Sequence, residues 1–245
     1  MNINKLNRQS DEKANITSQV SWGRLLLGII IMLVLPAVIL FGSSGRLDWG
    51  MAWIYIGMIT AFTVGSRIIM LRKNPDLIAE RAHFSDKGDI KPWDKILNPL
   101  VAIFGITALI VVGLDMRFGW SPKLPVMVQV TALVITVLGY FLTSWATVVN
   151  RFFSPVVRIQ RERGHVVVTS GPYQYVRHPG YAGGIVSNLA MPLMLNSIWA
   201  LVPAILAVCI FVARTALEDR TLQEELEDYS DYVVRVHYRL LPGVW

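Results

Sequence analysis

Charged residues and cysteines are both scarce in this 245-residue sequence. Only 16% of the residues are Asp, Glu, Lys or Arg, whereas a soluble domain carries about 25%. The hydrophobic fraction is 53%, so the composition indicates an integral membrane protein. The single cysteine, Cys209, lies within an apolar run. It excludes an internal disulfide framework and a cysteine-based zinc site.

Several catalytic signatures are missing as well. The sequence has no glycine-rich dinucleotide fingerprint, no P-loop, and no H-E-x-x-H or G-x-S-x-G motif. The four histidines, His83, His165, His178 and His237, are scattered without the spacing of metal ligands. We therefore expect neither a soluble nucleotide-binding fold nor a serine hydrolase, and no bound metal.

Positive charge exceeds negative charge, with a formal net charge of +6. In a soluble protein this excess would suggest a nucleic-acid partner. Here the basic residues flank apolar segments, which is the pattern that the positive-inside rule of membrane proteins produces. We therefore expect a lipid bilayer rather than a nucleic acid around this chain.

Apolar runs long enough to cross a hydrocarbon core of about 30 Å recur along the sequence. We predict an all-α, polytopic integral membrane protein with about six transmembrane helices. The last two would form a helical hairpin, and a C-terminal amphipathic helix would follow over residues 214–238. The predicted spans are 22–41, 49–69, 97–114, 124–149, 179–196 and 198–213.

Polar segments divide the chain into three parts. Residues 1–21 form a polar tail, residues 22–149 hold four spans with a polar segment at 71–96, and residues 150–245 hold the remainder. We expect part of the 71–96 segment to lie on the membrane surface.

The distribution of basic residues predicts the orientation. All but three of the 23 Lys and Arg residues fall in the segments on the side of the N-terminus; the three are Arg46, Arg117 and Lys123. The positive-inside rule then places both termini and the 150–178 segment in the cytoplasm. With short outside loops and no secretion signal, this pattern indicates a prokaryotic inner membrane.

The most conspicuous polar stretch is residues 164–184, GHVVVTSGPYQYVRHPGYAGG. An extended apolar run, Val166, Val167 and Val168, precedes a Ser-Gly-Pro turn. Tyr173, His178 and Tyr181 offer aromatic faces and hydrogen-bonding tips that suit an adenine and a ribose, and Arg177 offers a fixed cation. Pro179 suits the first turn of a helix, which puts His178 at the cap. The alternative is an interfacial belt that anchors the helix to lipid headgroups.

Arg214 and Glu218 form a second candidate pair, at the end of the sixth predicted span. They lie four residues apart and so share one helix face. Ionisable groups at membrane depth are costly and favour a functional role. The alternative is a surface ion pair worth a few tenths of a kcal/mol.

These motifs resemble one family. HVVVTSGPYQYVRHPGY, followed by RTALED, then Tyr229-x-x-Tyr232 and the ending RLLPGVW, is similar to the isoprenylcysteine carboxyl methyltransferases, to which membrane phospholipid methyltransferases are related. The resemblance covers about residues 150–245. It implies S-adenosylmethionine as the cofactor and makes residues 150–245 a cofactor-binding methyltransferase core on the cytoplasmic side.

The resemblance also implies roles for individual residues. Arg214 matches the arginine that faces the acceptor carboxylate, and Glu218 matches a cofactor contact. Arg158 stands where the eukaryotic enzymes have glutamine, and Gln160 is a possible substitute for it. The other matching cofactor contacts are His165, Val166, Val167, Val168, Tyr173, His178, Pro179, Gly180 and Tyr181.

The expected reaction is methylation of a lipid-like or isoprenylcysteine-type acceptor, with carboxylate O-methylation favoured over an amine acceptor. A sulfonium is already a good leaving group, so positioning would supply much of the catalysis. An amine acceptor would need a base, for which Glu218 or His178 are candidates. Two alternatives remain: an NADPH-dependent reductase of the sterol reductase type, with Arg158, Arg161 and Arg163 on the 2′-phosphate, and a non-catalytic membrane scaffold.

Overall fold

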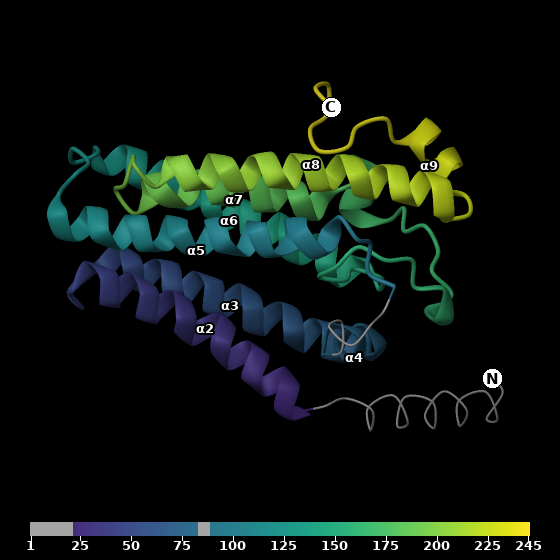
Figure 1. Ribbon diagram of the computed structural model, residues 1–245, viewed down its shortest axis with the longest axis horizontal. Coiled ribbons are helices and arrows are strands. Elements are labelled where there is room, and N and C mark those ends of the chain that lie inside the picture. Colours follow the sequence, from purple (N-terminus) through teal and green to yellow (C-terminus); the bar gives the residue numbers. More distant parts are fainter. Residues whose placement is uncertain (1–21, 83–88) are drawn as a thin grey trace.

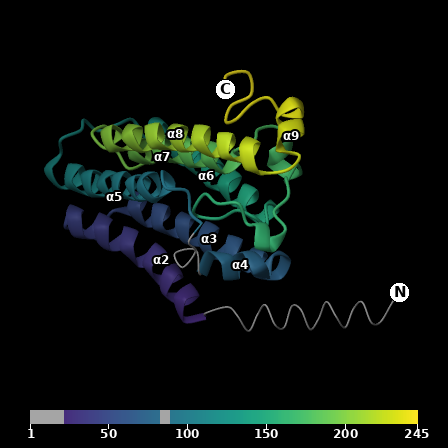
Figure 2. The same cartoon turned by 45° about the vertical axis from the view of Figure 1, so that its right-hand side comes forward.

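The computed structural model describes residues 22–82 and 89–245. The predicted polar tail, with its basic residues, and His83 lie outside these residues. Figure 1 shows long helices running roughly antiparallel, with α4 and α9 at one end of the bundle. The 150–178 segment lies at that same end, which we call the site end. Figure 2 shows the same arrangement after a 45° turn.

Five of the helices are long and apolar enough to cross a membrane. The first four predicted spans correspond to α2 (Trp22–Ser44), α3 (Gly50–Lys73), α5 (Asp94–Phe118) and α6 (Val126–Val149), and the sixth to α8 (Leu201–Glu225). No strand occurs among the described residues. The prediction of an all-helical, polytopic membrane protein is confirmed.

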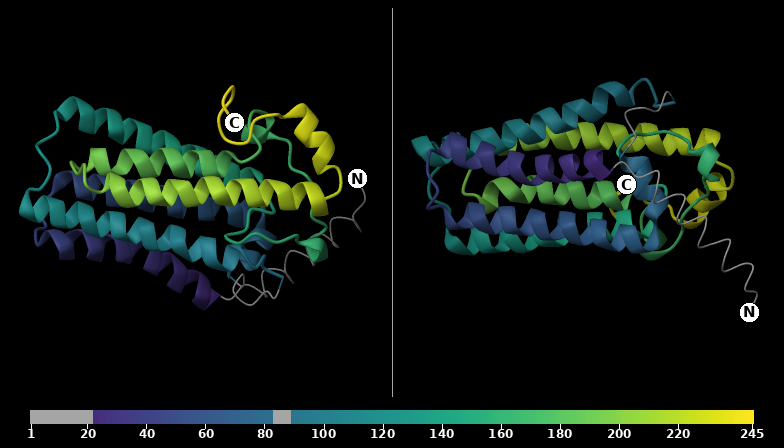
Figure 3. Two further views of the ribbon diagram at one scale, coloured as in Figure 1. Left: turned by 45° about the horizontal axis from the view of Figure 1, so that its top comes forward. Right: turned by 90° about the horizontal axis from the view of Figure 1, so that it is seen from below.

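The fifth predicted span is the short partner of the predicted hairpin. It forms α7 (Pro179–Met194), with 16 residues, or about 24 Å at 1.5 Å per residue, less than a full hydrocarbon core. Asn196, with φ of 61°, makes the turn to α8. Figure 3 shows α7 and α8 side by side, so the hairpin is present with one arm too short to span alone.

The predicted amphipathic helix over 214–238 is wrong as a separate element. α8 continues without a break through the charged residues to Glu225, and a short helix, α9 (Tyr229–Arg235), follows. Asp228 separates the two with a left-handed φ of 62°. Because α8 carries its charged end into the site end of the bundle, Arg214 and Glu218 lie in the middle of one continuous helix.

The segment before α5 includes a short helix that packs on the bundle. α4 (Pro75–Ala82) starts with proline at its first position, as expected. Its Leu77 and Ile78 are fully buried and pack with Met70, against Val148 of α6. α4 is therefore packed against the helix bundle, and its position on the membrane surface stays a prediction.

Close packing of α6 on α7 positions the first turn of α7, which carries the candidate site residues Gly180 and Tyr181. A Cβ on Gly183 would lie 2.4 Å from the carbonyl oxygen of Gly139, and one on Gly139 would lie 2.7 Å from that of Gly183. Small residues that let two backbones approach this closely are typical of membrane helix pairs. The opposite end of the bundle is tied by Asp115, which accepts bonds from the hydroxyls of Ser121 and Ser197, both at 2.5 Å.

Candidate functional site

One cavity of about 500 Å³ lies at the site end. The 150–178 segment, α7, the end of α8 and α9 form most of its wall, and α2, α4, α5 and α6 complete it. Every residue predicted to bind the cofactor or to carry the reaction lines this cavity except Pro179, which is the first residue of α7. The volume falls in the range of small-molecule and cofactor sites.

Asp219 is the buried centre of the polar network behind this wall. Its side chain is fully buried and accepts two bonds from Arg177, through Nε at 2.8 Å and Nη2 at 3.1 Å. His178 Nε2 lies 3.1 Å from the same carboxylate. Further donors are Tyr229, Gln223 and Arg239. Such a charged group is stable in the interior only when it is paired and hydrogen-bonded in this way.

Arg177 also ties the C-terminal segment to the motif. Its Nη1 donates to the carbonyls of Val236 and His237, both at 2.8 Å. The backbone N–H groups of Arg177 and His178 donate to the carbonyls of Tyr238 and Arg239, both at 2.9 Å. The guanidinium of Arg177 is therefore engaged by the protein itself. Its predicted role as a cofactor cation stays a prediction, and its visible role is to hold the cavity wall in place.

Arg214 and Glu218 are not bonded to each other. Arg214 Nε lies 2.6 Å from Oδ1 of Asp94, and its Nη2 donates to Asp94 Oδ2 and to the carbonyl of Pro155. Glu218 accepts a bond of 2.5 Å from the hydroxyl of Tyr181. The alternative of a surface ion pair therefore fails, because both side chains face the cavity and have other partners.

His165 lies against Phe152, with ring centroids 4.5 Å apart. Its Nδ1 accepts the backbone N–H of Gln160 at 3.3 Å. Burial, aided by the positive charges of Arg163 and Arg158, lowers the pKa of His165 to about 4. The imidazole is therefore neutral near pH 7, and its Nε2 carries the proton.

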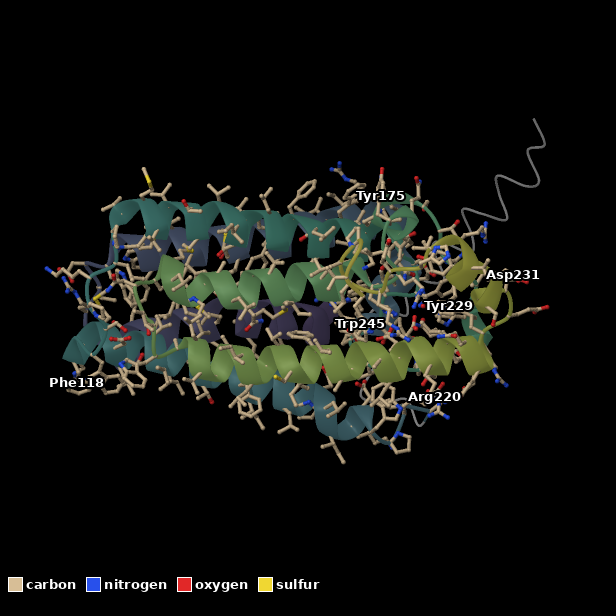
Figure 4. All side chains as sticks on the ribbon, turned by 90° about the horizontal axis from the view of Figure 1, so that it is seen from above. Phe118, Tyr175, Arg220, Tyr229, Asp231 and Trp245 are labelled. Atoms are coloured by element: carbon tan, nitrogen blue, oxygen red, sulfur yellow. The ribbon has the colours of Figure 1, made fainter. Side chains whose placement is uncertain are left out.

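Three tyrosines form an aromatic part of the wall. The hydroxyl of Tyr232 donates to the carbonyl of Tyr173 at 2.6 Å, and Tyr229 packs edge-on against Tyr232 at 5.5 Å. Burial raises the pKa of all three hydroxyls above the ordinary value, so they stay protonated. Figure 4 shows Tyr229 among the side chains crowded at the site end, with Phe118 at the other end of the bundle.

Arg158 and Gln160 have structural partners. Arg158 is bonded to Glu80, Asp89 and Glu162. Gln160 donates to the carbonyl of Phe152 at 2.7 Å and accepts from Arg163. With Arg158 surrounded by three carboxylates, it is a poor ligand for the 2′-phosphate that the reductase alternative requires.

Sequence reasoning missed several residues of this site. Asp219 stood inside the RTALED motif without an assigned role, and Asp94, Tyr229 and Tyr232 were not among the candidate site residues. A signal was present for Asp219, because a carboxylate beside an apolar run needs a cationic partner. Nothing local indicated that Asp94 would meet Arg214, because 120 positions separate them. Among the described residues, no cluster of His, Cys, Asp and Glu could hold a metal ion.

The fold is that of a polytopic helical membrane protein, and a cavity of cofactor size lies at one end of its bundle. Residues 130–224 match the model of the isoprenylcysteine carboxyl methyltransferase family. The resemblance that the motifs carry is thereby confirmed for this segment, which holds α7, the loop before it and almost all of α8.

Several proteins that match this chain are named protein-S-isoprenylcysteine O-methyltransferases. Protein-S-isoprenylcysteine O-methyltransferase B of Arabidopsis thaliana is 33% identical over 107 residues, which are 42% of this chain and 54% of that protein. The enzyme of Mus musculus is 34% identical over 109 residues, 43% of this chain and 38% of that protein. The matches thus span about half or less of these relatives. Their plant and animal sources give no support to the expectation of a prokaryotic inner membrane.

A solved structure also resembles this chain. It is the eukaryotic intramembrane Ras methyltransferase ICMT, with a TM-score of 0.49 and 17% sequence identity, over 95% of this chain and 98% of that one.

Proposed function

We propose that this chain is a membrane-embedded methyltransferase that uses S-adenosylmethionine to methylate an amphipathic, isoprenylcysteine-type acceptor, with a carboxylate as the favoured methyl-accepting group. The observation that carries the proposal is one continuous cavity. It joins the predicted cofactor wall to Arg214 and to the side chains of Met32 and Val101 on α2 and α5. The cofactor and a lipid-like acceptor would therefore meet within one continuous cavity.

The residues present fit this cofactor. Glu218 supplies a carboxylate for a cationic ligand, and Tyr173, Tyr229 and Tyr232 supply aromatic faces with protonated hydroxyls. The neutral His165 adds a donor at Nε2. When bound, S-adenosylmethionine would supply the methyl group from its sulfonium. Loss of this methyl group turns the sulfonium into a neutral thioether, which is a good leaving group. The protein then has to position the acceptor and exclude water, which can contribute about 7–11 kcal/mol.

Arg214 is oriented for the acceptor. Its Nε and Nη2 are held by Asp94 and Pro155, and Nη1 has no partner among the described residues, although the side chain lines the cavity. A single fixed N–H group can orient a carboxylate oxygen towards the methyl donor. A carboxylate is already deprotonated at neutral pH and needs no general base.

The first test is the unfolding midpoint of detergent-purified protein with S-adenosylhomocysteine, S-adenosylmethionine and NADPH in turn. A ligand at 100 times its dissociation constant stabilises by about 2.7 kcal/mol, so we expect both adenosyl compounds to raise the midpoint. A rise with NADPH alone would favour the reductase. No rise with any of the three would favour a non-catalytic scaffold.

Two variants with matched controls separate the roles. Glu218→Ala should abolish the shift with S-adenosylhomocysteine, whereas Glu224→Ala, on the exposed ion pair with Arg220, should retain it. Arg214→Ala should abolish methyl transfer and largely spare cofactor affinity. The control Arg220→Ala should retain both methyl transfer and cofactor affinity. Normal turnover by both site variants would refute these assignments.

We further propose that the site end faces the cytosol, with both termini on that side. The support is the concentration of basic residues at this end, because positively charged loops are retained in the cytoplasm. In a Cys209→Ser background, Tyr175→Cys at the site end and Leu47→Cys at the other end can be labelled with an impermeant thiol reagent. In intact cells the reagent should reach only Leu47→Cys; the reverse pattern would overturn the orientation.

A further inference from the structure

Arg81, the penultimate residue of α4, lines the cavity. Its Nη1 donates to the carbonyl of Phe153 at 3.1 Å, and its guanidinium lies 5.8 Å from the centre of the Phe153 ring. Its Nε is buried and has no hydrogen-bond partner among residues 22–82 and 89–245. A buried cationic donor without an acceptor is costly, so this atom points to a missing ligand.

The neighbouring carboxylates are bonded to other arginines. Glu80 forms a two-point pair with Arg158, at 2.9 Å through both oxygens. Asp76 accepts from Arg163 at 2.6 Å and from Arg151 at 3.0 Å. Among the described residues, no carboxylate is left to neutralise Arg81.

Arg67 on α3 adds a second positive charge to this region. Burial, together with the charge of Arg67, lowers the pKa of Arg81 to about 9. Arg81 is therefore still charged at neutral pH, and the positive charge of Arg67 disfavours that charged form. An oxyanion placed beside Arg81 would remove this repulsion and satisfy the free Nε.

The surroundings of Arg81 show what kind of molecule would bring the anion. Met32 and Val101 line the same cavity, and Met32 is 49% exposed on the outer surface of the bundle. The cavity therefore reaches the lipid-facing side between α2 and α5. An anionic group at Arg81 could continue into an apolar chain that passes these side chains.

We propose that Arg81 is an anion-recognition residue that binds the phosphate or carboxylate group of an amphiphile whose apolar chain lies past Met32 and Val101. Arg81 and Arg214 line the same cavity, so the anionic group of an acceptor would be bound at Arg81 while Arg214 orients the methyl-accepting end. The identification of this ligand as the methyl acceptor rests on the proposed function. The anion site itself does not, because its occupancy is measured without turnover.

The test is equilibrium binding to the full-length protein in non-ionic detergent. The probes are hexadecyl phosphate, hexadecanoate, hexadecanol and inorganic phosphate. We expect both anionic amphiphiles to bind at least about tenfold more tightly than hexadecanol, because charge-assisted hydrogen bonds exceed neutral contacts. Comparable binding of hexadecanol, or equally tight binding of inorganic phosphate, would overturn the proposal.

Variants assign the preference to one residue. Arg81→Gln should remove the preference for anionic over neutral probes, and Arg81→Lys should keep most of it. Arg72→Gln, an exposed arginine at the end of α3, is the matched control and should behave as wild type. If Arg81→Gln does not fold, Arg81→Lys and Arg67→Gln decide: the first must retain the preference and the second must weaken it. An unchanged preference in Arg81→Gln refutes the assignment.

The same preparations separate the two proposals. S-adenosylhomocysteine should bind Arg81→Gln as it binds wild type. If wild type fails to bind S-adenosylhomocysteine but prefers the anionic probes in an Arg81-dependent way, the proposed function fails and the anion site stands.

Discussion

Arg214 and Asp94 form a buried two-point ion pair that joins α8 to the first residue of α5. Nε of Arg214 lies 2.6 Å from one carboxylate oxygen of Asp94 and Nη2 lies 3.2 Å from the other. Asp94 also accepts the backbone N–H of Val157 at 2.7 Å. One carboxylate thus holds both Arg214, which is proposed to face the acceptor, and the loop that contains Val157.

Asp94 does not line the cavity, but Asp94→Asn should reduce methyl transfer because Asp94 holds Arg214 in place. The amide keeps the shape but leaves Arg214 as an uncompensated buried charge, which costs about 3–5 kcal/mol. We expect a lower unfolding midpoint, a fall in kcat/KM of at least about tenfold, and affinity for S-adenosylhomocysteine within about threefold of wild type. Asp48→Asn, on the exposed pair with Arg46, should change none of these. Wild-type kcat/KM in folded Asp94→Asn would contradict a positioning role.

Asp219→Asn should weaken cofactor binding instead. Asp219 accepts bonds from the motif, from α9 through Tyr229 and from the C-terminal segment through Arg239. Loss of its charge leaves Arg177 buried without a carboxylate, so the cavity wall should loosen. We expect a loss of about 3–5 kcal/mol in stability and at least tenfold weaker binding of S-adenosylhomocysteine.

Titration calorimetry and the unfolding midpoint measure both effects of Asp219→Asn. The matched control is Glu224→Gln, because the exposed Arg220–Glu224 pair on the same helix contributes about 0–1 kcal/mol. If Asp219→Asn binds the cofactor analogue as wild type does, the network behind the wall is not required for the site.

Local sequence pattern was sufficient for most of the fold. The apolar runs predict α2, α3, α5 and α6, because a run of about twenty apolar residues has few stable states other than a membrane helix. The motif at 164–184 supplies about a third of the residues that line the cavity. Its functional side chains lie within about twenty residues of one another, so their proximity needs no long-range information.

The errors come from contacts between distant segments. The charged residues after Ala213 indicated a new amphipathic helix, yet α8 continues because Arg214 and Asp219 are buried by partners elsewhere in the chain. The break after Glu225 falls at Asp228, which adopts a left-handed conformation without being glycine. No local rule of helix termination predicts that position.

Gly183→Ala should destabilise the protein far more than Gly184→Ala. A Cβ at Gly183 would lie 2.4 Å from the Gly139 carbonyl oxygen and 2.5 Å from Thr143 Oγ1, whereas the nearest atom at Gly184 is 3.7 Å away, on Phe211. Overpacking costs about 1–3 kcal/mol, and a rigid backbone contact gives the higher figure. Unfolding midpoints in one detergent measure the difference. Equal midpoints would show that α6 and α7 can separate without cost.

The pH dependence of stability should report on His165. Its folded pKa of about 4 lies below the ordinary value of 6.5 for histidine, so between these values the unfolded chain binds a proton that the folded chain does not. Stability should therefore fall as the pH drops from 6.5 to 4, by up to roughly 3 kcal/mol from this residue. His165→Phe keeps the stacking on Phe152 and removes the titrating group. The unfolding midpoint of this variant should change less with pH over that window, whereas His237→Phe, at an exposed histidine, should follow wild type. Identical pH profiles for wild type and His165→Phe would show that His165 is not held in its neutral form.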